Sequence, residues 1–338
     1  MQYLCGKISK KMKILGLGNA LVDVLSRLDD DKTLVNIGIQ KGAMDMISKE
    51  QMVLIREYQK GVQTTKAPGG SNCNTIRTIS LLGGESGFIG KVGDDDLADF
   101  YEQAIRKSKA FSHLIKTTGM SGSCTVFISP DGERTMDTYL GPAPTISPDE
   151  ITDELLKGYD CIYIEGYLIV NEELVRETMK KAKRLGLIVA LDLANYNIVN
   201  AFKGLLEDVI PKYVDILFAN ESEAEAFTGK KAEEAVSILE KQVHISLVTL
   251  GKRGSLIGSE GKVIHVDAEG GKPVDTTGAG DNFAAGFLYG QSVGASLKQS
   301  AQIGSMLSGY VIDVIGAQIP EDKWQQIKLK VKEILAYA

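Results

Sequence analysis

Short β-rich runs alternate with helical stretches along most of this 338-residue chain, and this alternation constrains the fold more than any other feature. The runs that read as strands are Lys13–Leu17, Gly87–Ile89, Cys161–Ile164, Ile188–Leu191, Ile216–Phe218 and Ser246–Leu250. The stretches that read as helices are Asn72–Leu82, Leu97–Lys107, Glu172–Leu185, Ile198–Leu206, Ser222–Phe227, Ala232–Gln242, Phe283–Tyr289, Leu297–Val314 and Asp322–Leu335. Strands that alternate with helices predict an α/β protein with a mainly parallel sheet, covered by helices on both faces.

Two stretches break the alternation. One is Leu21–Leu25 followed by Lys32–Ile47, and the other runs from Ser123 to Tyr139. The second contains strand-like residues on both sides of Pro130-Asp131-Gly132, which predicts a hairpin. Neither stretch is long enough to fold alone, so we expect the two to pair into a small β-sheet lid over the body.

These patterns set the expected domain boundaries. The first 11 residues are basic and mostly polar and lack the apolar segment of a signal peptide, so they are either a tail or the product of a start codon upstream of Met12. The expected units are a tail at 1–11, an α/β body at 12–20, 48–118 and 141–338, and a β lid at 21–47 and 119–140.

Composition narrows the class of partner. The net charge is −6 and no Lys/Arg-rich block occurs, which argues against nucleic acid as a partner. No apolar run approaches the ~20 residues that cross a bilayer, so we expect no membrane span. The four cysteines are widely spaced, as in a cytoplasmic protein with reduced thiols, and the three histidines show no zinc-site spacing.

The most specific local signal is the stretch Val274–Gly286. Small residues from Thr277 to Gly280 allow a tight glycine turn, and the apolar run Phe283–Tyr289 predicts a buried helix behind it. Unpaired N–H groups and the positive end of the helix dipole then form an anion site, of which phosphate is the usual occupant. Asp281 is a carboxylate at that site, so it is either an N-cap or a base that takes a proton from an attacking hydroxyl.

The stretch Lys13–Asp23 resembles a dinucleotide fingerprint only superficially, because Leu21 replaces the third glycine and Asp23 comes too early for the ribose-binding acid. A dehydrogenase is therefore a distant possibility. Asn19 and Asp23 lie instead at one strand exit, where an amide and a carboxylate could hold vicinal hydroxyls. Read alone, they are better explained as a turn asparagine and a solvent-exposed acid.

A second glycine turn leads into the helix expected at Asn72–Leu82. Gly69 and Gly70 allow the backbone to approach a ligand closely, and Asn74 offers an amide in the first helical turn. Ser71 is also a good helix cap, and the two interpretations are compatible.

Two further loops follow strands. Asn220 and Glu223 are three residues apart and offer hard oxygen ligands suited to Mg²⁺, often through water, although a helix cap with an acidic face explains them equally well. Thr249, Gly251 and Gly254 leave the next strand and could line a nucleotide or form a plain β-turn. The chain contains no P-loop motif.

Taken in order, these motifs resemble the ribokinase-like (PfkB-type) family of sugar and nucleoside kinases, and its adenosine-kinase branch most of all. The resemblance runs from about Met12 to Gln318 and rests on four motifs. They are Gly-x-Gly-Asn-x-Leu-x-Asp, Gly-Gly-Ser-x-x-Asn, Asn-x-x-Glu and Asp-Thr-x-Gly-Ala-Gly-Asp. The family implies a three-layer α/β/α body with a β lid, ATP and Mg²⁺ as cofactors, and phosphorylation of a primary hydroxyl.

The resemblance also implies roles for individual residues. Asp281 is the catalytic base, and Gly278, Ala279 and Gly280 form the anion hole. The residues expected to bind the acceptor hydroxyls are Asn19, Asp23, Gly69, Gly70 and Asn74. The residues expected to bind ATP are Asn220, Thr249, Gly251, Gly254, Gly278, Gly280 and Arg134 of the lid hairpin. Mg²⁺ is expected at Asn220 and Glu223, and K⁺, which family members often need, is expected near Asp275 and the loop around Gly316.

The acceptor is the least defined part of the expected activity. Adenosine kinases place paired aromatics around the base, and Tyr167, Leu168 and Tyr196 are the residues that could form such a slot here. We therefore expect adenosine or another nucleoside as the small-molecule substrate of a monomer or homodimer. The alternatives are a kinase for ribose, fructose or a keto-sugar acid, and a non-catalytic nucleotide-binding regulator on the same fold.

Overall fold

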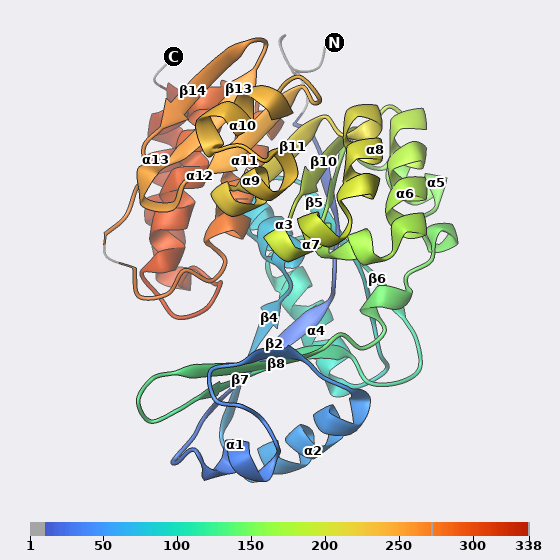
Figure 1. Cartoon of the computed structure of the whole chain (residues 1–338), viewed down its shortest axis with the longest axis vertical. Coiled ribbons are helices and arrows are strands. Elements are labelled where there is room, and N and C mark those ends of the chain that lie inside the picture. The colour runs from blue at the N-terminus through green and yellow to red at the C-terminus, as the bar shows by residue number, and fades with distance from the viewer. Residues whose placement is uncertain (1–10, 272, 337–338) are drawn as a thin grey trace.

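The computed structural model describes residues 11–271 and 273–336, so residues 1–10 of the expected tail lie outside the described residues. Within those ranges the strands form one nine-stranded and one five-stranded sheet. The large sheet lies in the body of the molecule, and the small one lies below it in Figure 1. In the same ranges, no helix is long and apolar enough to cross a membrane.

The large sheet confirms the predicted mainly parallel α/β fold. In spatial order its strands are β14 (Lys262–Val266), β13 (Ser255–Ser259), β12 (Ile245–Thr249), β11 (Ile216–Asn220), β10 (Ile188–Asp192), β9 (Cys161–Ile164), β1 (Ile14–Leu17), β5 (Ser86–Val92) and β6 (Phe111–Lys116). Neighbouring strands from β12 to β6 run parallel, whereas β13 and β14 add an antiparallel edge. Each of the six predicted strands overlaps one of these, but β6, β13 and β14 were not predicted.

Helices cover both faces of this sheet because its strands are apolar on both faces. Leu15 and Leu17 of β1 belong to one core cluster and Ile14 to the other. The first face carries α5 (Asp153–Lys157), α6 (Glu172–Arg184), α7 (Tyr196–Ala201), α8 (Lys203–Tyr213), α9 (Glu221–Thr228) and α10 (Ala232–Leu239). The second face carries α3 (Ser71–Leu82), α4 (Asp96–Lys107), α11 (Ala279–Ser292) and α12 (Leu297–Ile312), with α13 (Trp324–Ala336) packed on α12.

The other predictions in the body differ only in detail. The helix expected at Ile198–Leu206 is divided between α7 and α8, which meet at Phe202. Five short 3₁₀ turns complete the described chain: η1 (Ala143–Thr145), η2 (Pro148–Glu150), η3 (Gly166–Val170), η4 (Gly251–Arg253) and η5 (Glu321–Lys323).

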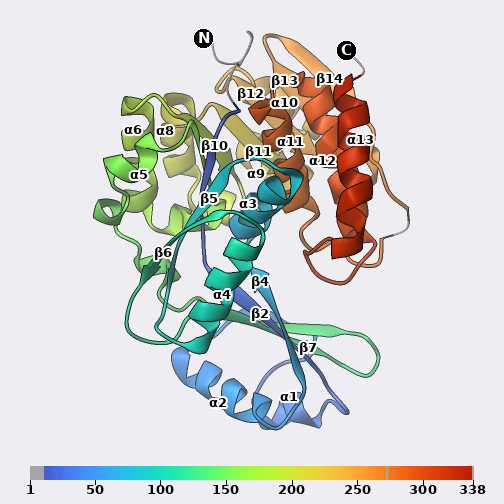
Figure 2. The ribbon, with the colours of Figure 1, turned by 180° about the vertical axis from the view of Figure 1, so that it is seen from behind.

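The small sheet contains the predicted hairpin. Its spatial order is β3 (Met44–Met46), β8 (Arg134–Tyr139), β7 (Gly122–Ile128), β2 (Leu21–Arg27) and β4 (Thr64–Gly69), and β7 pairs with β8 in the antiparallel sense. Two short helices, α1 (Lys32–Asn36) and α2 (Lys49–Gln59), lie beneath it in Figures 1 and 2. We refer to this sheet and these two helices as the lid.

The lid includes more of the chain than the sequence indicated. Residues 48–69 were assigned to the body, but Met52 and Ile55 of α2 pack on Phe127 of β7, and β4 pairs with β2. The α2 segment was missed because its apolar residues are few and stand among charged and polar ones.

One face of the lid sheet carries side chains that matter below. Residues that pair across neighbouring strands point to the same face, and alternate residues of a strand point to opposite faces. The three paired rows on this face are Asp23, Cys124 and Thr138; Leu25, Val126 and Met136; and Arg27, Ile128 and Arg134. The opposite face carries Phe127 and packs against α1 and α2, so the face with Asp23 is the one left for the body.

Lid and body are joined by hydrogen bonds at the start of α4. Asp95, the N-cap of α4 in the body, accepts a 3.0 Å bond from Arg56 of α2 and a 2.6 Å bond from the Ser121 hydroxyl beside β7. A side chain on Gly93 would lie 2.0 Å from the Gly119 carbonyl oxygen, so the two backbones touch there. This end of the lid is therefore closely fitted to the body.

Candidate active site

The predicted glycine turn opens α11. Gly278 has φ of +76°, a left-handed conformation suited to glycine, and a side chain there would lie 2.5 Å from the Ala317 Cβ. The helix begins at Ala279, so the turn and the first helical residues direct N–H groups and the positive end of the dipole to one point. Gly278, Ala279 and Gly280, the residues predicted to form the anion hole, lie at this point.

Asp281, in the first turn of α11, is held by α3 rather than acting as an N-cap. Its carboxylate accepts a 2.6 Å bond from the Ser71 hydroxyl and a 2.9 Å bond from the Asn74 amide. Burial raises the pKa of Asp281, and these two hydrogen bonds only partly oppose that rise. The result is a fixed carboxylate that is a stronger base than an exposed aspartate.

Asn74 was predicted to bind substrate hydroxyls, but both ends of its amide are occupied. Its nitrogen bonds Asp281, and its oxygen accepts a 2.9 Å bond from Gln318. In this structure Asn74 therefore positions the predicted base. Its place in the first turn of α3 was read correctly, but its partner lies 207 residues away in the chain.

A cavity of about 220 Å³ lies beside Asp281, and we call it the acidic cavity. Its lining includes three carboxylates, Asp192, Glu223 and Asp281, together with Asn220 and Thr249. Burial raises the pKa of Glu223 to about 7, and burial together with the nearby Glu223 raises that of Asp192 well above its usual range. Three acids that resist ionisation together would be stabilised by a cation.

Asn220 and Glu223 form a capping box at the start of α9. The Asn220 side chain accepts a 2.9 Å bond from the Glu223 N–H, and the Asn220 N–H donates a 2.8 Å bond to Glu223. The cap is thus compatible with the predicted ligand role, because the same two residues also line the acidic cavity. Among the residues described, no three acids, cysteines or histidines are close enough to bind a metal directly, so these oxygens fit Mg²⁺ through water.

Asn19 and Asp23 have different environments. The Asn19 amide donates a 2.7 Å bond to buried Glu165, whereas no hydrogen bond to a described residue is found for the Asp23 carboxylate. Burial and the nearby Asp281 raise the pKa of Asp23 to about 7. The Asp23 carboxylate on the lid face is therefore free to accept hydrogen bonds, whereas the Asn19 amide is already bonded to Glu165.

The two glycines before α3 fit closely around these residues. A side chain on Gly69 would lie 2.4 Å from an Asp23 oxygen, and one on Gly70 would lie 2.3 Å from the Asn19 carbonyl oxygen. Gly70 also has φ of +85°. Both positions therefore need glycine for the approach of protein backbone and side chains, whatever ligand they contact.

Two acids of the site were missed in the sequence. Glu165 follows β9, accepts bonds from Asn19 and from the Asn72 N–H, and has a pKa raised by burial to about 7. Asp192 is the last residue of β10 and lines the acidic cavity. The available signal was their place at the carboxyl ends of parallel strands, where ligands bind in open α/β sheets.

The predicted base slot is only partly assembled. Tyr167 lines the acidic cavity, but Leu168 is buried in the core of the body, 1% exposed, and does not reach it. Tyr196 is 50% exposed and does not line the cavity either. Leu168 was misplaced because the chain enters the irregular turn η3 after β9, where Leu168 and the next residue, Ile169, are both buried in the core.

The loop after β12 contributes one residue to the cavity. Thr249 lines it, whereas Gly251 is the first residue of the short turn η4 and Gly254 follows that turn. A side chain on Gly254 would lie 2.0 Å from the Val266 carbonyl oxygen, so this glycine lets the turn pass close to β14. The β-turn interpretation therefore accounts for Gly254.

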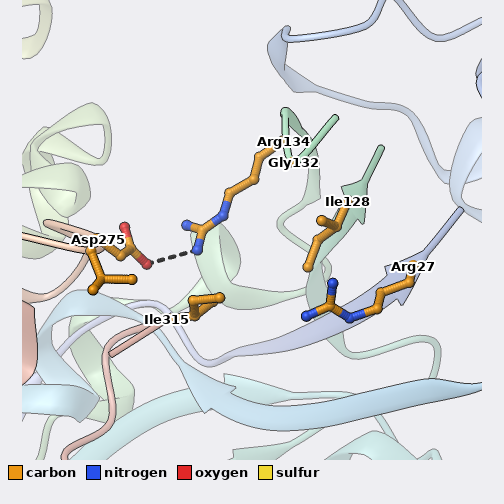
Figure 3. Close-up of a pocket in the computed structure, with 7 residues that line it drawn as sticks. Arg27, Ile128, Gly132, Arg134, Asp275 and Ile315 are labelled. Carbon is orange, nitrogen blue, oxygen red and sulfur yellow. Dashed lines mark hydrogen bonds and ion pairs between the residues drawn. The ribbon is translucent and has the colours of Figure 1, made fainter. Parts of the chain in front are cut away.

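Arg134 of the lid donates a hydrogen bond to Asp275 of the body across a second cavity, which has a volume of about 390 Å³ (Figure 3). Asp275 also accepts bonds from the Gly316 N–H and from the N–H and hydroxyl of Thr277. Burial acts to raise the pKa of Asp275, but the hydrogen bonds from Gly316 and Arg134 outweigh it and lower the value to about 2. With a guanidinium and three further donors, this carboxylate does not fit K⁺ in the conformation seen here.

Known proteins resemble most of the chain. The profile described as pfkB family carbohydrate kinase matches residues 32–324. The adenosine kinase structure from Sinorhizobium meliloti is 32% identical, with a TM-score of 0.82 over 95% of this chain and 99% of that one. A probable sugar kinase protein from Rhizobium etli CFN 42 is 30% identical, with the same TM-score and coverage. An adenosine kinase of Schizophyllum commune is 28% identical over 94% of this chain and 98% of its own.

Proposed function

This chain belongs to the pfkB family of carbohydrate kinases, and we propose that its acceptor is adenosine or another nucleoside. The family, the ribokinase-like fold and a phosphotransferase that acts on an alcohol group, all predicted from the sequence, are confirmed. ATP is the phosphate donor and the acceptor is a sugar or a nucleoside. The choice of acceptor, the metal and the roles of individual residues are parts of the proposal.

The proposal rests above all on the position of Asp281, whose carboxylate is held by Ser71 and Asn74 beside the start of α11. Each oxygen of a carboxylate has two lone pairs, so either one can still accept the proton of a hydroxyl. Asp281 takes that proton while the hydroxyl oxygen bonds to the γ-phosphorus. The bond from this phosphorus to the bridging oxygen breaks, and ADP leaves.

The turn at Gly278–Gly280 stabilises the charge that develops on the transferred group. Its N–H groups and the dipole of α11 are fixed before the reaction, so no reorganisation is needed when negative charge appears. Glu223, Asn220 and Asp192, which line the same cavity as Gly280, would hold a hydrated Mg²⁺ there. Bound Mg²⁺ supplies positive charge to the phosphates.

The lid supplies the acceptor site. Asp23 accepts hydrogen bonds from the ribose hydroxyls, and its pKa near 7 makes that role sensitive to pH. Leu25, Val126 and Met136 form an apolar row next to Asp23 on the same face of the lid. A flat aromatic base would bury against this row and against Tyr167, whereas a free sugar would leave the row in contact with water.

The sugar kinase remains the second candidate because two of the three residues expected to form the base slot, Leu168 and Tyr196, do not line the acidic cavity. Kinetics on adenosine, inosine, ribose and fructose, measured side by side, separate the two. We expect adenosine to have a kcat/KM about tenfold above the free sugars, since one good aromatic contact adds ~0.5–1.5 kcal/mol beyond burial. A free sugar that outruns both nucleosides would replace this proposal with the sugar kinase.

A further inference from the structure

The cavity between lid and body has an unusual lining, and we call it the basic cavity. Arg27 and Ile128 reach it from the ends of β2 and β7, Gly132 and Arg134 reach it from the hairpin, and Val274, Asp275 and Ile315 reach it from two loops of the body (Figure 3). The lining thus contains two guanidinium groups, one carboxylate and three apolar side chains.

Arg27 is the group that the mechanism above leaves without a role. It pairs in register with Ile128, which pairs with Arg134, so all three point to the same face of the lid. Figure 3 shows the guanidinium of Arg27 directed into the cavity. The side chain is exposed, and within the described residues it has no hydrogen-bond or ion-pair partner.

Arg134, in contrast, is already occupied by Asp275 at 2.9 Å. Asp275 is ionised throughout the neutral range because its pKa lies at about 2. The pair therefore leaves one unbalanced positive charge in the basic cavity, and that charge is on Arg27.

The phosphate site of the reaction adjoins this cavity along the chain. Asp275 accepts hydrogen bonds from Thr277, which directly precedes the turn at Gly278. Asp275 and Gly278 are three residues apart in the chain, a separation that spans at most about 10 Å. A nucleoside triphosphate seated on that turn therefore brings several negative charges within reach of the long arginine side chains of the lid. Its terminal phosphates offer the geometry that guanidinium groups bind best.

We propose that Arg27 is a second phosphate-binding residue of the ATP site, and that Asp275 acts as an internal anion that holds Arg134 until the triphosphate enters. This inference rests on the proposed kinase function and extends its donor site. Arg27, being free, binds the terminal phosphates first. Arg134 then exchanges Asp275 for phosphate, and Asp275 keeps its bonds to Thr277 and Gly316.

Calorimetric titration with ATP and with AMP tests the assignment. The variants are Arg27→Gln, Arg27→Lys and, as a matched control, Arg106→Gln, because Arg106 lies on α4, is 65% exposed and lines neither cavity. We expect Arg27→Gln to weaken ATP binding about tenfold or more, to leave AMP binding unchanged, and to reduce the salt dependence of ATP binding. Arg27→Lys keeps the charge but loses the fork, so its ATP affinity should be intermediate.

Three results would overturn the inference: unchanged ATP affinity in Arg27→Gln, an equal loss for ATP and AMP, or a loss confined to the acceptor. Turnover of the wild-type protein is measured in parallel. If the wild type phosphorylates a nucleoside or sugar while Arg27→Gln binds ATP normally, only this inference fails. If the wild type binds no ATP, the proposed function fails with it.

Discussion

The acidic and the basic cavity are both lined in part by residues 275–281, but the pKa values of their carboxyl groups are shifted in opposite directions. In the acidic cavity, Asp192, Glu223 and Asp281 lie together without a cationic side chain in the lining, and burial raises the pKa of each. In the basic cavity, the single carboxylate, Asp275, has donors on both oxygens, and its pKa is lowered to about 2. Burial dominates in the first case and hydrogen bonding in the second.

This difference distinguishes acids that can take up a ligand from an acid that supports the structure. The acids of the acidic cavity are poorly compensated by the protein, so they are ready to take up a cation or a proton. Asp275 is compensated already, and it contributes to stability. Because its folded pKa is depressed, that contribution is present above the unfolded value of 3.8 and is lost only as the pH falls toward 2.

The strongest test of the acidic cavity is Asp281→Asn. We expect kcat to fall by ~10²–10⁴ while ATP and acceptor still bind, because the amide keeps the shape but cannot take the proton. Asp267→Asn is the matched control, since the Asp267 side chain is 97% exposed. A near-normal kcat in Asp281→Asn would remove the general base from the mechanism.

Glu223→Gln tests whether the cavity takes a cation. We expect the Mg²⁺ midpoint for activity to rise by roughly tenfold or more, and saturating Mg²⁺ to restore part of the rate, since a metal held through water is weakened rather than lost. Glu221→Gln controls for charge on the same helix, because Glu221 bonds Arg253 outside the cavity. Identical midpoints in wild type and Glu223→Gln would exclude the assignment.

Asp23→Ala tests the lid side of the comparison. The acceptor KM should rise roughly tenfold or more with ATP affinity unchanged, as expected for the loss of a hydrogen bond to a charged group. In the wild type, the acceptor KM should also rise as the pH falls below about 7, because the raised pKa of Asp23 leaves the carboxyl protonated there. An acceptor KM that stays the same in the variant would show that Asp23 does not contact the acceptor.

The smallest expected effect concerns the basic cavity. Arg134→Gln should lower the free energy of unfolding in urea by less than about 1 kcal/mol, since a partly exposed pair contributes little and Asp275 keeps three other bonds. Asp275→Ala should cost more, because it removes all four. Equal losses in the two variants would mean that Arg134 is a fixed structural partner and is not free to exchange.

Sequence reasoning succeeded where the signal was local. The turn at Gly278, the helix after it and the Asn220–Glu223 pair depend on residues within a few positions, so each could be read directly. Glu165 and Asp192 could not, because their importance arises only when parallel strands bring their carboxyl ends together. Leu168 failed for a related reason, since the direction of a side chain in an irregular turn is not set by any period.

The bonds from α3 to Asp281 also bear on how the protein is made. Ser71 and Asn74 are synthesised 210 and 207 residues before their partner, an interval of about 10–40 s at ordinary translation rates. Contacts of such sequence separation close late in folding. A nascent chain can therefore build β1, α3 and the lid long before it has Asp281, and the proposed mechanism allows phosphotransfer only after α11 has left the ribosome.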